Sequence, residues 1–315
     1  MAKYKVFVDG NVGTTGMQIE ERLKARSDIE LLTIPEKDRK DPEVIKKFIN
    51  DSDITFLCLP DAAAREAVEL AKGSSAKIID ASTAHRTNPD WCYGFSELGA
   101  EFKEKLKSSK RVAVPGCHAS GFISLIYPLV KEGVLSPDAD ISATSLTGYS
   151  GGGKKLIEKY EGESRDKNSL KAPMPYALSL SHKHLPEMTK ICSLTKPPVF
   201  LPVVGDYYKG MLVSVPLNAD KLSVLPKELN AVYEKYYGGS NFVKVMPFNA
   251  DLSESGGFLS PELVNGTNEL QIYVFSNGDQ VMLCSVLDNL GKGSGGAAVQ
   301  CMNIMLGIDE TISLN

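Results

Sequence analysis

Three glycines between an apolar segment and an amphipathic one constrain this chain more than any other feature. The sequence VFVDGNVGTTGMQIEERL carries Gly10, Gly13 and Gly16 between a short predicted strand and a helix predicted over residues 16–26. Glycines there allow a tight turn and close backbone approach, so that a pyrophosphate rests on the helix N-terminus. The spacing differs from the commoner G-x-G-x-x-G, but the strand before it and the helix after it are the context that motif requires. The turn therefore predicts dinucleotide binding, with a glycine-rich turn that binds nothing as the alternative.

The first third of the chain alternates strand-like and helix-like segments. Five apolar runs are separated by amphipathic stretches, one of which begins with Asp41 as helix cap and Pro42 at the first helical position. This alternation predicts a parallel sheet covered on both faces. After Gly116 the strand-like runs are longer, and Asn277-Gly278 signals a hairpin between two of them. The fold class is thus α/β, with a Rossmann-like dinucleotide-binding domain over residues 1–116 followed by an α+β domain.

Composition excludes several classes of partner. The 315 residues suffice for two domains, and a net charge of -4 gives no electrostatic reason to expect nucleic acid or an anionic membrane. Six cysteines are scattered without CxxC pairs or metal-ligand spacing, which is typical of free thiols in a reducing cytosol and predicts no metal site. A strand begins at once after the N-terminus and no apolar run has membrane-spanning length, so we expect a cytoplasmic protein without a signal peptide.

A cysteine at a predicted helix start is the strongest candidate for chemistry. In VAVPGCHASGFISLIYPLV, Pro115 and Gly116 end a buried strand, and apolar residues recur at helical spacing from Cys117 onward. Unpaired backbone N–H groups and the helix dipole favour a thiolate at that position. A structural cysteine would more often lie in mid-strand or on the apolar face of a helix. We therefore interpret Cys117 as a candidate nucleophile.

An activated cysteine usually needs a base or a cation within hydrogen-bond reach. The chain has only four histidines, at positions 85, 118, 182 and 184. His118 is adjacent to Cys117, but neighbours on a helix point in different directions. His182 and His184 flank Lys183 just before a helix predicted to start at Leu185. We predict that one of these two serves Cys117, and a structural role is the alternative for each.

Two polar segments are candidates for binding anions. The loop SLTGYSGGGKK, residues 145–155, combines a strand end with three glycines and a lysine, and its N–H groups can bind an anion. Ser82, Thr83 and Arg86 come just after the fourth predicted strand, at the sheet edge where ligands bind. Arg86 could hold an anionic substrate group bidentately. A floppy surface loop and an ordinary salt bridge are the alternatives.

Two further segments bear on the nucleotide. After the second predicted strand, an acidic residue could hold a ribose hydroxyl, whereas Arg39 or Lys40 could hold a 2′-phosphate. A solvated charged loop is the alternative there. Lys292 lies in a second glycine-rich loop before the final predicted helix, which is compatible with phosphate or cofactor.

Together these motifs resemble the N-acetyl-gamma-glutamyl-phosphate reductases of arginine biosynthesis, of the shorter type, within the aspartate-semialdehyde dehydrogenase superfamily. The resemblance covers nearly the whole chain and rests on the glycine turn, DASTAHR, YGFSEL, VPGCHASG, SGGGK, SHKHLPEM, NGTN and DNLGKGSGGAAVQCMN. His118 and Ser120 stand where many members have an aromatic residue and a threonine. Lys154 and Lys209 stand where many have arginine, and they keep the charge but lose the bidentate fork.

The resemblance implies a reaction and a cofactor. Cys117 would attack the acyl phosphate, release phosphate and form a thioester, which a hydride from NADPH would reduce to N-acetylglutamate 5-semialdehyde. His182, or failing that His184, would be the acid/base that holds the thiolate and protonates the thiohemiacetal oxygen. A thioester is the better hydride acceptor because, unlike a carboxylate, its carbonyl is electrophilic.

The resemblance also implies which residues form each domain and which bind the cofactor and the substrate. Residues 117–289 would form a semialdehyde-dehydrogenase-like catalytic and oligomerisation domain, the helix within 290–315 would complete the NADP domain, and the protein would be a homo-oligomer, a dimer or a tetramer. The residues expected to bind NADP(H) are Gly10, Gly13, Thr14, Thr15, Gly16, Arg39, Ser82, Ser150, Gly151, Asn289 and Lys292. Those expected to bind the substrate are Arg86, His118, Lys154 and Lys209.

Three other functions remain open on the residues alone. The substrate could be another acyl phosphate, of the aspartyl or aminoadipyl type. The chain could be a cysteine hydrolase or acyltransferase that uses Cys117 and His182 without redox chemistry, against which the glycine turn argues. It could also be a nucleotide-sensing binding protein with a vestigial site, in which case Cys117→Ser would change no biochemical property.

Overall fold

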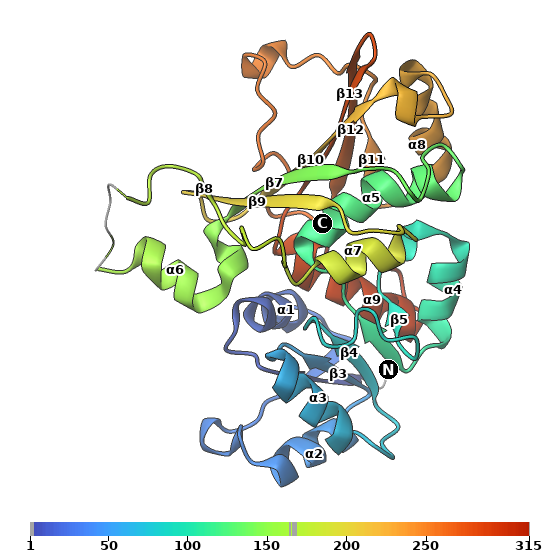
Figure 1. Ribbon diagram of the computed structural model, residues 1–315. Coiled ribbons are helices and arrows are strands. Elements are labelled where there is room, and N and C mark those ends of the chain that lie inside the picture. The colour runs from blue at the N-terminus through green and yellow to red at the C-terminus, as the bar shows by residue number, and fades with distance from the viewer. Residues whose placement is uncertain (1–2, 164, 166–168, 315) are drawn as a thin grey trace. The chain divides into compact units, whose positions relative to one another are not determined.

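The computed structural model describes residues 3–163, 165 and 169–314 (Figure 1). The chain divides into two compact units, residues 1–116 with 294–315 and residues 117–293. Met1, Ala2 and Asn315, which our predicted domain ranges include, lie outside the described residues. Within the described part, no helix is long and apolar enough to cross a membrane.

The first unit is built on a six-stranded sheet in the order β2-β1-β3-β4-β6-β5, in which every neighbouring pair is parallel. Its strands are β1 (Tyr4–Asp9), β2 (Ile29–Leu32), β3 (Ile54–Leu57), β4 (Lys77–Asp80), β5 (Cys92–Tyr93) and β6 (Arg111–Ala113). Its helices are α1 (Thr14–Lys24), α2 (Pro42–Asp51), α3 (Asp61–Leu70), α4 (Ala100–Ser108) and α9 (Gly296–Leu306). The predicted parallel sheet is confirmed, and all four residues of β3 are buried, as expected of a strand covered on both faces. The short edge strand β5 gave no sequence signal.

Local chemistry sets where the helices of this unit begin. Helix α1 starts at Thr14, two residues before the predicted start, because Gly13 already serves as its extended N-cap. Helix α2 starts at Pro42, and the side chain of Asp41 accepts a hydrogen bond from the backbone N–H of Glu43 at 2.9 Å, which confirms the predicted cap. The helices and strands enclose a core that includes Phe7, Ile49, Leu57, Ile78 and Trp91.

The C-terminal helix α9 belongs to the first unit, and buried polar contacts join it to that unit's N-terminal part. The Arg26 guanidinium donates to the amide oxygen of Asn303 at 2.6 Å, and the Gln300 amide donates to the Ser96 hydroxyl at 3.0 Å. Ten of the eleven residues of α9 are buried. Because a helix apolar on all sides is stable only when it is enclosed, α9 forms part of the core of this unit.

The second unit is built on a mixed seven-stranded sheet in the order β11-β12-β13-β10-β7-β9-β8. Its strands are β7 (Ser142–Gly148), β8 (Met174–Pro175), β9 (Val199–Gly205), β10 (Met211–Asn218), β11 (Val243–Val245), β12 (Leu270–Asn277) and β13 (Gln280–Leu287). Its helices are α5 (Cys117–Lys131), α6 (Gly153–Glu161), α7 (Leu185–Ile191) and α8 (Leu229–Tyr237). Asn277 pairs with Gln280 and Gly278 has φ +57°, so the predicted hairpin is confirmed.

Helix α5 packs closely on one face of this sheet. A Cβ at Gly121 would lie 2.5 Å from the Val213 side chain on β10, so only glycine permits this approach. Pro128 has no N–H to give to the Ser124 carbonyl one turn earlier, and the Tyr237 hydroxyl of α8 donates to that carbonyl instead, at 2.8 Å. The proline is therefore tolerated inside α5, which presents Cys117 at its first residue.

Candidate active site

Cys117 is the first residue of α5, as predicted, and its side chain is half-buried. The fifteen-residue helix directs the N–H groups of its first turn and the positive end of its dipole toward this position. A Cβ at Gly293 would lie 2.8 Å from the Cβ of Cys117, so the glycine-rich segment 291–295 passes directly against the cysteine. Cys117 is thus partly accessible and sits in an electropositive environment that favours the thiolate.

Three histidine rings gather at the same end of α5. The centroid of the His118 ring lies 5.2 Å from that of His182 and 5.5 Å from that of His184, and the last two are 4.8 Å apart. His182 is half-buried, whereas His184, at the N-cap of α7, is only 4% exposed. The structure thus brings His182 and His184 to the neighbourhood of Cys117.

One hydrogen bond fixes the tautomer of His182. The backbone N–H of His184 donates to Nδ1 of His182 at 3.1 Å. Nδ1 must therefore act as an acceptor, and the neutral ring carries its own proton on Nε2. In this arrangement His182 offers an N–H donor at Nε2, which suits a thiolate or a developing oxyanion.

The His118 ring is enclosed by the protein and does not face a ligand. Its ring is 3% exposed, its Nδ1 is 2.7 Å from the Ser145 hydroxyl, and its Nε2 is 2.8 Å from the Tyr176 hydroxyl. Burial, followed by the electrostatic influence of His182 and Lys183, lowers the pKa of His118 to about 3. The ring is therefore neutral and both of its nitrogens are engaged.

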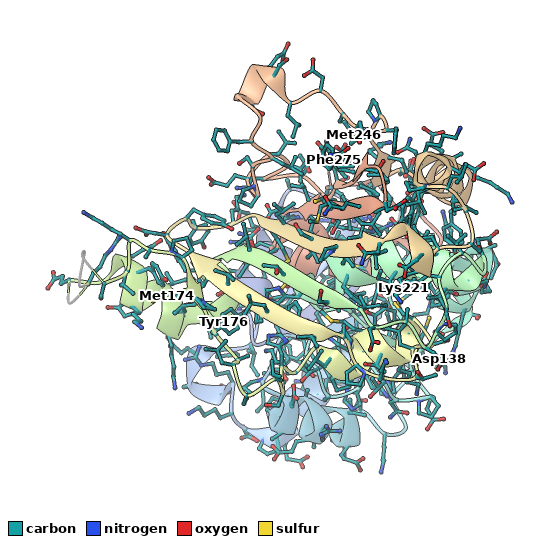
Figure 2. The ribbon with its side chains drawn as sticks, turned by 45° about the horizontal axis from the view of Figure 1, so that its top comes forward. Asp138, Met174, Tyr176, Lys221, Met246 and Phe275 are labelled. Atoms are coloured by element: carbon teal, nitrogen blue, oxygen red, sulfur yellow. The ribbon has the colours of Figure 1, made fainter. Side chains whose placement is uncertain are left out.

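Tyr176 is a site residue that the sequence analysis missed. It follows β8 (Figure 2). Its backbone N–H donates to the Pro202 carbonyl at 3.0 Å, and its ring lies 5.9 Å from that of His182. Burial and then the negative charge of Cys117 raise its pKa above the usual range. Its only sequence signal is an aromatic residue six positions before His182, in a segment without helical or strand periodicity.

The glycine-rich loop after β7 forms a polar network with the end of β13. The Asn289 amide donates to the Ser150 hydroxyl at 2.9 Å and accepts from the backbone N–H of Gly210 at 2.8 Å. A Cβ at Gly151 would lie 3.6 Å from the same amide nitrogen. The structure thus brings together Ser150, Gly151 and Asn289 of the predicted cofactor-binding set. Lys292 is buried, and its Nζ lies 5.6 Å from the centroid of the Phe242 ring.

The two lysines predicted to bind substrate have different surroundings. The ammonium of Lys209 lies 3.3 Å from the carboxylate of Asp288. Asp288 is 1% exposed and also accepts the backbone N–H groups of Gly266 and Leu290, both at 2.8 Å. Lys154, by contrast, is exposed at the second position of α6, and no contact found among the described residues joins it to Cys117. The sequence analysis did not identify Asp288.

In the first unit, the predicted turn is sterically restricted to glycine at two positions. Gly10 has φ +83°, and a Cβ there would lie 2.3 Å from the Cys58 carbonyl oxygen, while a Cβ at Gly16 would lie 2.5 Å from the Gly10 carbonyl oxygen. Gly13 caps α1 without a side-chain hydrogen bond, so the first N–H groups of α1 have no side-chain cap. A pyrophosphate fits this cradle, because it needs close backbone approach and free N–H donors.

The two threonines of the turn differ in their contacts. Within the described part of the chain the Thr14 hydroxyl is buried without a hydrogen-bond partner, which suits a group that binds a ligand. The Thr15 hydroxyl lies 2.9 Å from that of Ser294, so it joins the turn to the segment before α9 within the same unit. Arg39, after β2, is half-buried and pairs with Glu36 at 3.3 Å.

The segment after β4 is held by buried hydrogen bonds. Asp80 is fully buried and accepts from both the hydroxyl and the N–H of Ser82 at 2.8 Å, and its Oδ2 lies 2.6 Å from Nδ1 of His85. The guanidinium of Arg86 donates to the carbonyls of Val114 at 2.9 Å and Ala81 at 3.1 Å. Arg86 therefore holds the backbone after β4 and β6 in place, a structural role that the sequence did not reveal.

Comparison with known proteins agrees with the two units. Residues 5–106 match the NAD binding domain of semialdehyde dehydrogenase, and residues 117–289 match its dimerisation domain. The chain is 44% identical over 322 residues to N-acetyl-gamma-glutamyl-phosphate reductase 2 of Nostoc sp., covering 100% of both chains. It is 46% identical over 308 residues to N-acetyl-gamma-glutamyl-phosphate reductase of Chelativorans sp., covering 96% of this chain and 98% of the relative.

Solved structures show the same fold at low identity. Aspartate semialdehyde dehydrogenase II from Vibrio cholerae, complexed with ASA, matches with a TM-score of 0.74 at 15% identity over 98% of this chain and 99% of that chain. Aspartate semialdehyde dehydrogenase with NADP from Candida albicans matches with a TM-score of 0.68 at 14% identity over 99% of this chain and 100% of that chain. At these identities the likeness concerns the fold.

Proposed function

The chain belongs to the N-acetyl-gamma-glutamyl-phosphate reductases of the semialdehyde dehydrogenase family, and from that premise we propose that it reduces N-acetyl-gamma-glutamyl phosphate to N-acetylglutamate 5-semialdehyde and phosphate in arginine biosynthesis. The reaction passes through a thioester on Cys117. One observation carries the proposal: Cys117 begins α5 with an accessible thiol, and the rings of His182 and His184 gather at that same helix end.

In the first step the sulfur of Cys117 attacks the carbonyl carbon of the acyl phosphate. The C–S bond forms as the C–O bond to the phosphate breaks. Cys117 attacks as its thiolate, which the Nε2–H of His182 stabilises, and the departing phosphate takes its proton from solvent. We assign the stabilisation of the thiolate and the later proton transfer to His182, with His184 as the alternative. The N–H groups at the start of α5 stabilise the negative charge that develops on the carbonyl oxygen.

In the second step the thioester is reduced to the aldehyde. When bound, the reduced nicotinamide cofactor supplies the hydride for the thioester carbonyl. The helix N–H groups and the Nε2–H of His182 hold the oxyanion on the resulting thiohemiacetal. His182 or His184 donates a proton to this oxygen and takes it back as the C–S bond breaks and the aldehyde carbonyl forms. Breaking the C–S bond returns Cys117 to the thiolate, a good leaving group.

The cofactor is NADP(H). Gly10, Gly13, Thr14, Thr15 and Gly16 hold the pyrophosphate, a role supported by the steric restriction at Gly10 and Gly16 and by the partnerless Thr14 hydroxyl. Arg39 holds the 2′-phosphate. To do so, its guanidinium exchanges the ion pair with the exposed Glu36 for one with the phosphate. The remaining cofactor-binding residues are Ser82, Ser150, Gly151, Asn289 and Lys292.

The substrate is bound by Arg86, Lys154 and Lys209, with His118 as an indirect contributor. Lys209 is the best supported of these, because the buried Asp288 holds its ammonium in place without removing it from solvent. The N-terminal domain, residues 1–116, is completed by the helix within 290–315, and residues 117–289 form the catalytic and dimerisation domain. Six free cysteines support a reducing, cytoplasmic location.

The enzyme is a homo-oligomer, and the face of the seven-stranded sheet opposite α5 is its interface. By strand register Leu201 of β9, Pro216 of β10 and Met282 of β13 lie on that face, and all three are exposed. An apolar sheet face of this kind is covered in a stable protein. Leu201→Glu is expected to lower the sedimentation coefficient to that of a monomer, whereas Leu225→Glu, an exposed leucine before α8, leaves it unchanged. An unaltered oligomer in the Leu201 variant would exclude this face.

The test of the activity follows absorbance at the nicotinamide band with protein, phosphate, NADP and N-acetylglutamate semialdehyde. We expect phosphate-dependent reduction of NADP that Cys117→Ser abolishes. Signal with aspartate semialdehyde instead would keep the mechanism and change the substrate. No signal with either substrate would leave a cysteine hydrolase or acyltransferase as the better reading.

A further inference from the structure

Asp288 is a buried carboxylate that no step of the mechanism described above uses. It follows β13 directly, and Lys209 comes shortly before β10. Because Met211 and Leu287 pair across these two strands, Asp288 and Lys209 lie at the same end of the sheet. Asp288 is 1% exposed, and its Oδ2 lies 3.3 Å from the ammonium of Lys209, whose side chain is 33% exposed. The carboxylate is thus closed to solvent, whereas the ammonium that it holds can still meet a ligand.

Two backbone hydrogen bonds fix the carboxylate of Asp288. Its Oδ1 accepts the N–H of Leu290 and its Oδ2 accepts the N–H of Gly266, both at 2.8 Å. These donors belong to different stretches of the chain, one after β13 and one before β12. Hydrogen bonds to a charged group that are shielded from water are strong and costly to break. The carboxylate is therefore a rigid anchor for the ammonium.

The backbone carbonyl of Asp288 makes a second connection, toward the nucleophile. It accepts the N–H of Gly291 at 3.1 Å and that of Gly293 at 3.0 Å. A Cβ built at Gly293 would lie 3.2 Å from this carbonyl oxygen and 2.8 Å from the Cβ of Cys117. Gly293 is therefore packed between Asp288 and Cys117, and a side chain at that position would collide with both.

The backbone of Lys209 is also held, so only its side chain is left to be placed. The Asn265 amide donates to the Lys209 carbonyl at 2.8 Å, and the N–H of Gly210 donates to the Asn289 amide oxygen at 2.8 Å. A lysine ammonium is a point charge on a flexible four-carbon stem and has no fixed direction of its own. The ion pair with Asp288 selects one of the positions that the ammonium could take.

We propose that Asp288 is a positioning residue that fixes the separation between the Lys209 ammonium and the nucleophile Cys117. Its carboxylate holds the ammonium, and its carbonyl holds the turn that is packed against the cysteine. The ammonium then binds an anionic oxygen of the substrate, in a carboxylate or a phosphate, while the substrate carbonyl carbon rests at the sulfur. A site arranged in advance binds more tightly because less order is lost on binding. This inference rests on the proposed function in taking Lys209 as a substrate-binding residue and Cys117 as the nucleophile.

The first test measures anion binding beside Cys117 without nucleotide or turnover. Cys117 is alkylated with iodoacetamide at increasing concentrations of inorganic phosphate or, separately, of N-acetylglutamate, and the modified peptide is quantified by mass spectrometry. We expect protection of the wild type, and the anion that protects shows whether Lys209 holds a phosphate or a carboxylate. Asp288→Asn is expected to raise the concentration for half-protection by about tenfold, because the ammonium is no longer held. No protection of the wild type by either anion, or an unchanged concentration in the variant, overturns the proposal.

Two further variants show whether Asp288 acts through Lys209. Lys209→Gln removes the ammonium and is expected to raise the half-protection concentration at least as much as Asp288→Asn does. Adding Asp288→Asn to Lys209→Gln is expected to cause no further loss, because the group on which Asp288 acts is already gone. Full additivity of the two substitutions would overturn the positioning role. Asp140→Asn, which removes the partner of Lys196 from an exposed ion pair, is the matched control and leaves the concentration unchanged.

Steady-state kinetics adds a readout that a merely structural role would not move. In the NADP-reducing direction, Asp288→Asn is expected to raise the KM of phosphate or of the semialdehyde by about tenfold, with kcat within about twofold of the wild type. A loss confined to kcat would contradict the proposal. A shift in protection without any reductase activity would refute the proposed function and leave this inference standing. Reductase activity with unchanged protection and unchanged KM would do the opposite.

Asp288→Glu keeps the proposal testable if Asp288→Asn does not fold, which urea unfolding would show. This variant retains the charge and displaces it by one methylene group. It is expected to raise the half-protection concentration less than Asp288→Asn does, but clearly above that of the matched control Asp140→Glu. A concentration equal to that of the control would overturn the proposal.

Discussion

The glycine turn of the first unit and the Cys117 end of α5 in the second unit both offer a helix N-terminus to negative charge, but they are built differently. The turn uses mainly its backbone, and its shape depends on the absence of side chains at Gly10 and Gly16. The cysteine site is built from side chains on three separate segments, around positions 117, 145 and 176–184. A phosphate needs only N–H donors and space, whereas acyl transfer needs a nucleophile, a proton carrier and fixed distances. The first kind of site is therefore local in sequence and the second is not.

The largest difference between the two sites appears when the sulfur is removed. Cys117→Ser is expected to lower reductase turnover by at least about 10⁴-fold, because the weaker nucleophile cannot form the thioester. Nucleotide binding, measured by fluorescence titration, should not change, since the turn holding the pyrophosphate is untouched. A variant with a tenth of the normal turnover would show that Cys117 is not the nucleophile.

The two histidines test which ring exchanges the proton. His182→Gln keeps an N–H donor near Nε2 but cannot carry a proton, and it is expected to lower kcat by about 10²- to 10⁴-fold with little change in nucleotide affinity. His184→Gln is expected to have the smaller effect on kcat, because that ring is buried at the helix cap. The pH–rate profiles of both variants decide the assignment. The reverse order of effects would make His184 the acid/base.

Gly10 and Gly73 have nearly the same φ. Substituting each of them therefore separates the effect of a steric contact from the effect of backbone conformation. Gly10 and Gly73 have φ +83° and +82°, but only a Cβ at Gly10 would meet a neighbour, at 2.3 Å. Gly73→Ala is expected to lower the free energy of unfolding by about 1 kcal/mol through strain alone. Gly10→Ala should lower it by roughly 2–3 kcal/mol more and weaken nucleotide binding, as urea unfolding and titration would measure. Equal losses in the two variants would mean that the turn relaxes around an added methyl group.

Arg39 tests the nucleotide preference of the first unit. Arg39→Ala removes the guanidinium proposed to hold the 2′-phosphate and is expected to weaken NADP binding by about tenfold or more. NAD affinity should stay constant because NAD lacks that phosphate. Lys40→Ala, one residue further along the same loop, serves as the matched variant. If it produces the larger loss, the phosphate contact moves to Lys40.

The remaining effects concern pH, and they have opposite signs in the two units. Burial raises the pKa of Asp9, at the end of β1, to about 6 from 3.8, so the stability it contributes is present below pH 4 and lost as the pH rises toward 6. Burial lowers the pKa of His118 to about 3 from 6.5, so its contribution is present above pH 6.5 and lost as the pH falls toward 3. Each window changes the free energy of unfolding by about 1.4 kcal/mol per pH unit at most.

Two substitutions make that contrast measurable by hydrogen exchange in each unit. Asp9→Asn is expected to stabilise the first unit above pH 6 and to have no effect below pH 4. His118→Gln is expected to flatten the acid-side loss of stability in the second unit. If the stability of the wild type and of both variants depended on pH in the same way, the burial of Asp9 and His118 would not be the cause of the pH dependence.

Sequence patterns predicted most of the fold. Strand and helix alternation is a local property, so the parallel sheet, the Asp41 cap and the hairpin at Asn277-Gly278 were all predicted correctly. Helix α1 begins two residues early because Gly13 caps it, and the edge strand β5 is too short for any periodicity to signal. These differences lie at element ends, where a single hydrogen bond decides the boundary.

The sequence by itself determined the chemistry that depends on neighbours along the chain: the glycine turn, a cysteine at a helix start, and the motifs that carry the family resemblance. Only the tertiary structure decided how side chains distant in sequence are paired. It set Tyr176 against His118, engaged Arg86 with backbone carbonyls and gave Lys209 the buried partner Asp288. The physical reason is that hydrogen-bond partners of buried polar groups are fixed by strand register and helix packing, which bring together residues that no sequence spacing relates.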